Sequence, residues 1–428
     1  MRMRWVAVIA ALCAFTAAAQ AGVEYLPEAD ALWVSDFPEA YPCTPELLAR
    51  VDASHGWGKV QYDGASQTCT VTCDLLIGRN DGSETWFQVG DAARPEETLI
   101  VQGDLRVYST WLLGENTEPL HEGRRRTNRL TLGVPDDPSI RPSLLIDNEQ
   151  GAGHTIVVGG FSGYGSENQG GDLCTYNATI GPVGDVPIGA AESGSRGMVF
   201  GGKGTLEVIG CTVRGVVGRA FGGQMTAGVF EDTRFEDCGI AIHGTYQEHV
   251  RGCSFVNCGT AIISGSRNAL KLTDCTFEGN ERNWSVQYLH AVAIDCTIDD
   301  FAKGNYEAER ETFLVSKRHV VVRVVDGEGR PVGGAEVRAS TDADVAAPAF
   351  ELRQAATGAD GLTPGEGADG ALLLSELVIR APQEADGEPV RSDYTWTIEA
   401  HAGDRSGRVE GFTPQESRQI VDITIDAQ

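Results

Sequence analysis

The sequence predicts an all-β protein with two parts, a solenoid of short strands and a smaller antiparallel β-sandwich. A short pattern returns along residues 206–301 every 20 to 22 residues, which is typical of solenoid coils. The chain holds 53 glycines among 428 residues and only 7% aromatic residues, as expected where a chain turns often. The pattern stops near residue 301, and apolar alternation resumes at residue 319.

Residues 1–21 have the pattern of a secretory signal peptide. A basic start, Met1–Arg4, precedes an apolar stretch from Trp5 to Ala19, and small residues surround the expected cleavage after Ala21. No later segment approaches the ~20 apolar residues of a membrane span. We therefore expect a protein that is secreted, periplasmic or associated with the cell envelope.

Residues 22–56 are expected to cover the open end of the first coil. Thr44 is a suitable N-cap, Pro45 suits the first helical position, and an apolar stripe follows as far as Val51. An uncovered coil would expose unpaired strand edges and core residues. A short amphipathic helix here is therefore a structural element.

Five repeats align on anchor residues, which are Cys211, Thr233, Cys253, Cys275 and Cys296. Apolar residues recur two positions after the anchors, at Val213, Phe235, Phe255, Phe277 and Ile298. Because side chains of a strand alternate between its faces, both sets should point inward, and positions −1, +1 and +3 outward. Less regular strands extend the predicted solenoid over residues 57–315.

The cysteines divide into two groups. Those of the repeats are expected to stack as buried free thiols, because parallel neighbours point the same way and a disulfide between them would be strained. They are Cys238, Cys253, Cys258, Cys275 and Cys296. Outside the repeats, Cys43 is expected to form a disulfide with Cys69 or Cys73.

The repeat itself resembles a known family. Residues 257–262 and 272–280, NCGTAI and LTDCTFEGN, resemble the right-handed parallel β-helix repeat proteins of the pectate-lyase-like superfamily. That resemblance implies a right-handed parallel β-helix. Polysaccharide lyases, glycoside hydrolases, phage tailspikes and non-catalytic surface proteins share this fold, so it does not define the function. The matching residues are structural and transfer no catalytic role.

Residues 319–428 are expected to form the β-sandwich. Alternating apolar runs flank a turn at 326–335, DGEGRPVGGA, and further strands follow near residues 394–400 and 420–425. This arrangement resembles the carboxypeptidase regulatory-like, prealbumin-type domain. The resemblance implies an accessory module for adhesion, spacing or stability.

Four carboxylates in the last two coils are the candidate chemical groups. Asp274 should lie over Asp295, and Glu278 over Asp299, at about one coil spacing. Paired carboxylates suit a glycosidase, and clustered carboxylates suit Ca²⁺, the one metal that this pattern favours. The alternative is an outer sheet whose acids serve solubility.

Other residues could support such a site. Arg234 and Arg251 are the nearest basic residues in register with the carboxylates. Trp284 and Tyr288 are the best candidates for stacking on sugars, but packing of the insert between coils is the favoured explanation for both.

The formal net charge of −27 disfavours nucleic acid and anionic lipid as partners. We expect a non-catalytic protein that binds polysaccharide or another surface partner through its sheet face, without a cofactor other than Ca²⁺. A polysaccharide lyase or glycoside hydrolase is the alternative, and a structural spacer is a third hypothesis.

Overall fold

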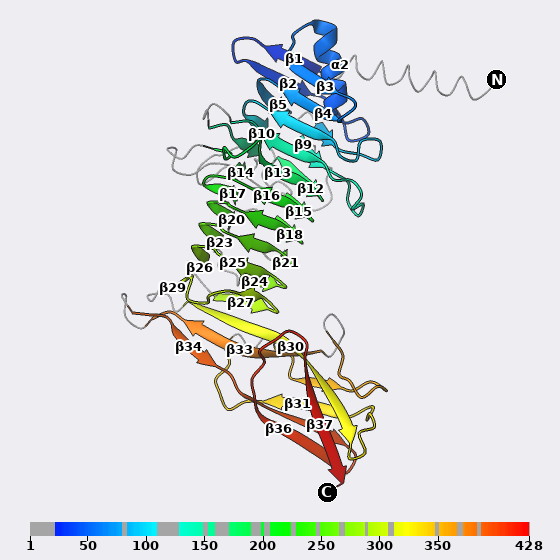
Figure 1. Ribbon diagram of the computed structural model, residues 1–428, viewed down its shortest axis with the longest axis vertical. Coiled ribbons are helices and arrows are strands. Elements are labelled where there is room, and N and C mark those ends of the chain that lie inside the picture. Colours follow the sequence, from blue (N-terminus) through cyan, green and yellow to red (C-terminus); the bar gives the residue numbers. More distant parts are fainter. Residues whose placement is uncertain are drawn as a thin grey trace, which may run out of the picture. The chain divides into compact units, whose positions relative to one another are not determined.

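The computed structural model describes residues 22–78, 84–108, 128–148, 153–158, 171–189, 198–200, 206–223, 228–244, 249–264, 270–286, 290–306, 312–346, 351–365, 371–382 and 387–427. The expected signal peptide at residues 1–21 lies outside these ranges. Within them the protein is nearly all-β, with long parallel sheets and one helix, α2 (Pro45–His55) (Figure 1). This helix is too short and too polar to cross a bilayer.

The chain divides into two compact units. The first consists of Met1–His249, Cys253–Ser264 and Glu278–Asn283, and the second of Val250–Gly252, Gly265–Phe277 and Trp284–Gln428. Each is described by itself.

The first unit is built from four sheets, numbered here 1 to 4. Sheet 1 has the order β1 (Gly22–Leu26), β2 (Ala31–Ser35), β5 (Asp74–Ile77), β8 (Leu105–Val107), β11 (Ile156–Val158) and β14 (Met198–Phe200). Sheet 2 has the order β3 (Val60–Asp63), β4 (Thr68–Val71), β7 (Thr98–Val101), β10 (Ser143–Ile146), β13 (Thr179–Pro182), β16 (Thr212–Arg214), β19 (Arg234–Glu236) and β22 (Ser254–Val256). Only the pairs β1–β2 and β3–β4 are antiparallel in these two sheets.

Sheets 3 and 4 are parallel throughout. Sheet 3 has the order β6 (Thr85–Val89), β9 (Asn128–Leu132), β12 (Asp172–Tyr176), β15 (Leu206–Ile209) and β18 (Gly228–Glu231). Sheet 4 has the order β17 (Arg219–Gly223), β20 (Ile240–Gly244) and β23 (Thr260–Ser264). Strands of one sheet are therefore separated in sequence by strands of the others, as a solenoid requires.

Parallel pairs of the same kind follow, in strands whose residues lie wholly or mostly in the second unit. One series joins, in this order, β21 (His249–Arg251), β24 (Leu270–Thr273), β27 (His290–Ile294) and β30 (Phe313–Asp326). A second pair joins β25 (Thr276–Glu278) and β28 (Thr297–Ile298). A third pair joins β26 (Arg282–Val286) and β29 (Gly304–Tyr306). The 14-residue strand β30 runs through the region where the solenoid was expected to end and the sandwich to begin.

Antiparallel strands follow in the same unit. They are β31 (Glu336–Ser340), β32 (Gln354–Ala356), β33 (Leu372–Arg380), β34 (Val390–Asp393), β35 (Trp396–Ala402), β36 (Arg405–Phe412) and β37 (Gln419–Ala427). Strand β30 pairs antiparallel with β33 and parallel with β37. Their inward residues, among them Val322, Val337, Leu372, Trp396 and Ile398, form one apolar core.

A small ionic cluster lies buried beside this core. The Lys317 ammonium donates to Glu351 Oε1 (3.1 Å) and to Ser375 Oγ (2.9 Å), while Arg353 Nη2 lies 2.6 Å from Glu351 Oε2. Burial holds the pKa of Lys317 below its ordinary value, and the Glu351 carboxylate opposes that shift. Removal of the one carboxylate would leave two cations without their partner.

The anchor column points inward as the sequence predicts. Cys211, Thr233, Cys253, Cys275 and Cys296 are all buried. Within the first unit the rings of Phe235 and Phe255 stack at 5.2 Å, so an aromatic ladder accompanies the anchors. Burial of these rings stabilises the coils at about 25 cal/mol per Å² of apolar surface.

The position before each anchor differs from the expected outward strand face. Asn177, Gly210, Asp232, Gly252, Asp274 and Asp295 all have positive φ, between +47° and +67°. Only glycine, aspartate and asparagine adopt this left-handed conformation readily. The column is therefore a corner where the chain leaves one sheet for the next.

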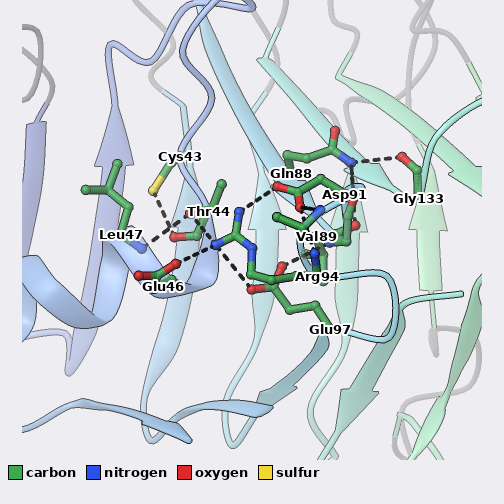
Figure 2. A network of polar contacts seen from close by, with 12 residues as sticks. Cys43, Thr44, Glu46, Leu47, Gln88, Val89, Asp91, Arg94, Glu97 and Gly133 are labelled. Carbon is green, nitrogen blue, oxygen red and sulfur yellow. Dashed lines mark hydrogen bonds and ion pairs between the residues drawn. The ribbon is translucent and has the colours of Figure 1, made fainter. Parts of the chain in front are cut away.

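The predicted helix is confirmed as α2. Thr44 Oγ1 accepts the N–H of Leu47 (3.3 Å), and the helix ends at Gly56, whose φ is +70°. Figure 2 shows the Arg94 guanidinium between Glu46 on one side and Asp91 and Glu97 on the other. The distances are 3.1, 2.6 and 3.7 Å, so Arg94 joins the first turn of α2 to the segment after β6.

The expected disulfide between Cys43 and Cys69 or Cys73 is not formed. All three are buried free thiols. Burial raises the pKa of Cys69 to about 12, and the pKa of Cys73 to about 12. The repeat thiols are also free and buried, and they donate to backbone carbonyls, for example Cys275 Sγ to Thr273 O (3.3 Å). They act as small interior groups, as predicted.

Candidate functional site

Asp295, one of the four candidate carboxylates, is a buried structural group. Its side chain is 1% exposed, and Oδ1 accepts the backbone N–H of His319 at 2.9 Å. The second oxygen is in close contact with Nδ1 of the same histidine. Burial would raise the pKa of Asp295, but the hydrogen bonds from His319 outweigh it and hold the pKa below its ordinary value.

The other three carboxylates have separate surroundings. Asp274 occupies the corner column, in register with Asp295 because Thr273 pairs with Ile294, and its Oδ2 lies 3.9 Å from Arg251 Nε. Asp299 accepts from Lys303 Nζ at 3.0 Å.

Glu278 is exposed at the end of β25. Arg234 is bound mainly by Glu236 (3.0 Å), whose hydrogen bond raises the pKa of Arg234, and Glu278 adds a smaller effect. Within the residues that the structure describes, no group of three or more His, Cys, Asp or Glu side chains is arranged to hold a metal ion.

Of the two aromatic candidates for stacking on sugars, the structure describes only Trp284. Trp284 is fully buried, and its ring packs edge-on against Phe277 at 5.9 Å, so it belongs to the interior. Tyr288 lies outside the described residues. The packing alternative therefore holds for Trp284.

A second set of polar residues, which sequence analysis did not single out, lies on the outward face of sheet 3. We call it the Arg129 cluster, and it comprises Trp86, Arg129, Thr131, Asp172, Cys174, Tyr176 and Glu207. Trp86 pairs with Arg129, and Arg129 with Asp172, across three adjacent strands. Thr131, Cys174 and Glu207 form the next row.

The Arg129 cluster is held together by direct contacts. The Arg129 guanidinium lies 4.1 Å from the centre of the Trp86 ring, a cation–π distance, and Nη2 donates to Asp172 Oδ2 at 3.0 Å. The hydroxyl of Tyr176 donates to the Glu207 carboxylate in a short hydrogen bond. Outward charges on a solvated sheet would be expected to stay apart and exposed, whereas Asp172 and Tyr176 are buried.

Burial affects the pKa values of three residues in the Arg129 cluster. Burial raises the pKa of Tyr176, and the hydrogen bond to Glu207 raises it further. Burial also raises the pKa of Cys174 to about 11. Desolvation lowers the pKa of Arg129, but its acidic neighbours outweigh that effect and keep the guanidinium charged.

Two polar atoms of the cluster are buried without a hydrogen-bond partner. They are the Oγ1 hydroxyl of Thr131, a residue only 8% exposed, and the Nε1 of Trp86. A buried polar group without a partner costs about 1–3 kcal/mol. Trp86, Arg129 and Glu207 are part-exposed around these atoms. The part-exposed side chains offer both hydrogen-bond donors, at Arg129, and acceptors, at Glu207.

The Arg129 cluster could not be predicted from the repeats, because most of its residues lie upstream of residues 206–301, where the spacing of the strands is less regular. Arg129 and Asp172 are 43 residues apart, about twice the repeat period. One signal was present, since the polar residues Arg129 and Thr131 alternate with leucines in β9. Comparisons of the chain with protein-family models, with curated proteins and with solved structures found no match.

Proposed function

We propose that this chain is an exported, non-catalytic protein that binds polysaccharide through the Arg129 cluster on sheet 3. In this proposal the parallel sheets form a right-handed parallel β-helix, and the antiparallel strands after β30 form a prealbumin-type sandwich that serves as an accessory module. The glycine, aspartate and asparagine corners and the parallel registers support the helix. The pattern of residues 1–21 supports export.

The observation that carries the proposal is the pair of unpartnered buried polar atoms in the cluster. Thr131 Oγ1 and Trp86 Nε1 lie in adjacent rows of one sheet face, where Trp86, Arg129 and Glu207 provide a part-exposed rim. Both atoms are closed to solvent in the free protein, so binding includes a shift of the part-exposed rim side chains that lets a sugar hydroxyl reach them. The indole face away from Arg129 can then contact the apolar face of a sugar ring. Binding would thus recover hydrogen bonds that the free protein lacks.

The experiment compares Thr131→Val with wild type in affinity electrophoresis through gels that contain soluble polysaccharides. Because the hydroxyl has no partner, its removal should leave stability unchanged or slightly higher. The affinity should fall by about five- to tenfold, the equivalent of about 1–1.4 kcal/mol. Thr212→Val, at an outward position of sheet 2, is the matched control and should bind as wild type does. Equal retardation of all three proteins would refute the proposed site.

A polysaccharide lyase or glycoside hydrolase is the second candidate function. It is favoured by the position of Tyr176 and Glu207, a hydroxyl–carboxylate pair, in the same cluster as a charged Arg129. Such groups can transfer protons and stabilise charge. Release of reducing ends, or ultraviolet absorbance of unsaturated products, would reveal turnover on a polysaccharide panel with and without Ca²⁺. Loss of that turnover in Tyr176→Phe and Glu207→Gln would favour the enzyme. A structural spacer, the third hypothesis, predicts neither binding nor turnover.

A further inference from the structure

An aromatic surface lies at the N-terminal end of the first unit, where β1 and α2 meet (Figure 1). We call Tyr25, His55 and Trp57 the cap platform. The rings of His55 and Trp57 stack at 4.5 Å with an angle of 16° between their planes, and the Tyr25 ring lies 6.3 Å from Trp57. His55 is exposed, and the other two residues are part-exposed.

The cap platform is held rigidly. The Tyr25 hydroxyl donates to Asp30 (2.8 Å), and the Lys59 ammonium lies 5.1 Å from the centre of the Tyr25 ring while it also binds Asp30. The backbone N–H of Trp57 donates to Asp52 O at 3.4 Å, directly after the C-cap of α2. Rings that are fixed before a ligand arrives lose little entropy on binding, so the surface is suited to recognition.

Hydrogen-bonding groups lie at the edges of these rings. His55 Nδ1 lies 3.0 Å from Val51 O and 3.1 Å from Ser54 Oγ, and because a carbonyl only accepts, we assign the donor role to Nδ1. The other ring nitrogen, Nε2, is then an acceptor. The indole N–H of Trp57 makes no hydrogen bond to another residue in the described part of the chain. The stack thus offers one donor and one acceptor beside apolar ring faces.

The charges around the cap platform indicate the class of ligand. Asp30 and Lys59 neutralise each other at 2.5 Å, so the three rings adjoin an ion pair without net charge. The whole chain carries −27, which repels a polyanion at longer range. An uncharged ligand with apolar faces and hydroxyl edges matches these features, whereas a uronate chain does not.

We propose that the cap platform is a second carbohydrate site, separate from the Arg129 cluster, and that it takes uncharged pyranose units of a glycan. The apolar C–H face of the sugar lies on the ring surface. Its hydroxyls meet Trp57 Nε1 and His55 Nε2. The two sites would then engage one long glycan or two glycans, which raises the apparent affinity through multivalency.

The test uses the full chain and four hexasaccharides, cellohexaose, xylohexaose, mannohexaose and hexagalacturonate, in titration calorimetry. At least one neutral hexasaccharide should bind, and Trp57→Ala should weaken it by about tenfold. Trp57→Phe keeps a ring and should retain more of the affinity. The matched control is Tyr41→Ala, which removes an aromatic side chain that is 61% exposed outside the platform and should leave binding unchanged. The two sites are tested by different variants, since Trp57→Ala changes only the cap platform and Thr131→Val changes only the Arg129 cluster.

Several outcomes would overturn the proposal. They are wild-type affinity in Trp57→Ala, tighter binding of hexagalacturonate than of every neutral hexasaccharide, and the absence of any binding. Sedimentation equilibrium provides a further check. Concentration-dependent self-association that Trp57→Ala abolishes would assign the cap platform to a second copy of this chain instead of a sugar.

Discussion

Substitution of Asp274 tests whether the acidic column serves a structural corner or a chemical site. Asp274 has a φ of +54°, in a column whose neighbouring members include Gly252 at +62° and Asp295 at +53°. For an ordinary L residue the left-handed conformation costs about 1–2 kcal/mol, and for a β-branched residue it is a severe outlier. Asp274→Val should therefore lower the free energy of unfolding by about 2 kcal/mol, whereas Asp274→Gly should change it little.

The contact between Asp274 and Arg251 should contribute little to stability. The Asp274 oxygen lies 3.9 Å from Arg251 Nε, and the two side chains are 31% and 64% exposed, so this pair contributes between about 0 and 1 kcal/mol. Urea unfolding followed by circular dichroism measures the difference. With a slope on the order of 1–3 kcal/mol per molar, a loss of about 2 kcal/mol lowers the midpoint by roughly 1 M.

The matched control for Asp274→Val is Glu278→Val, which also removes an acid from the candidate set. Glu278 is the exposed last residue of β25, where valine is well tolerated, so its midpoint should stay near that of wild type. Equal midpoints for the two valine variants would refute the corner explanation. A CaCl₂-dependent rise of the wild-type midpoint that is absent in Asp274→Gly would instead indicate that this carboxylate binds the ion.

Three further outcomes follow from the buried polar groups. Because the folded-state pKa of Asp295 is depressed, its contribution to stability is present above about pH 4, the ordinary value, and is lost as the pH falls through the folded value. Asp295→Asn should therefore lower the free energy of unfolding at neutral pH by about 1–3 kcal/mol and flatten its decline in acid, as urea titrations at several pH values would measure; an unchanged pH profile would contradict this. Glu351→Gln leaves Lys317 and Arg353 without their carboxylate and should lower the free energy of unfolding by about 3–5 kcal/mol, as thermal unfolding would measure. A decrease below about 1 kcal/mol would show that Lys317 is accommodated as the neutral amine. The ten described cysteines are buried thiols, so iodoacetamide should modify them in urea and not in the native protein, as mass spectrometry can show. A disulfide in the non-reduced protein would contradict the assignment of free thiols.

The inward-facing residues of the repeats could be predicted because they recur at a nearly constant spacing in the sequence. A buried strand face needs apolar or small residues at alternate positions, and Cys253, Phe255, Cys275 and Phe277 satisfy that need in consecutive repeats. The helix α2 was equally accessible, since Thr44 and Pro45 are local signals that act within one turn. Both features depend on residues close together in the sequence or on a repeat that fixes their spacing.

The corner column and the Arg129 cluster were harder to predict for different reasons. Glycine alternates with aspartate before the anchors, as at Gly210, Asp232 and Gly252, and this mixture is the signature of positive φ, but a polar residue there also fits an outward strand position. The Arg129 cluster depends on which irregular coils are neighbours. Paired residues of β6, β9 and β12 lie 43 residues apart, and those of β12 and β15 lie 33 apart, so the 20- to 22-residue period of the later repeats does not bring Trp86 beside Arg129.

The structure also bears on which carboxylates could serve an enzyme. A general acid needs a proton near neutral pH, hence a raised pKa and access to the substrate. Asp295 has the opposite shift and a buried side chain, so it suits a structural hydrogen-bond acceptor and not proton transfer. Glu97 has a raised pKa from burial, but its oxygens face Gly90 N and Arg94 inside the protein. Glu207, by contrast, meets the requirement for access, because its side chain is part-exposed and accepts the hydroxyl of Tyr176.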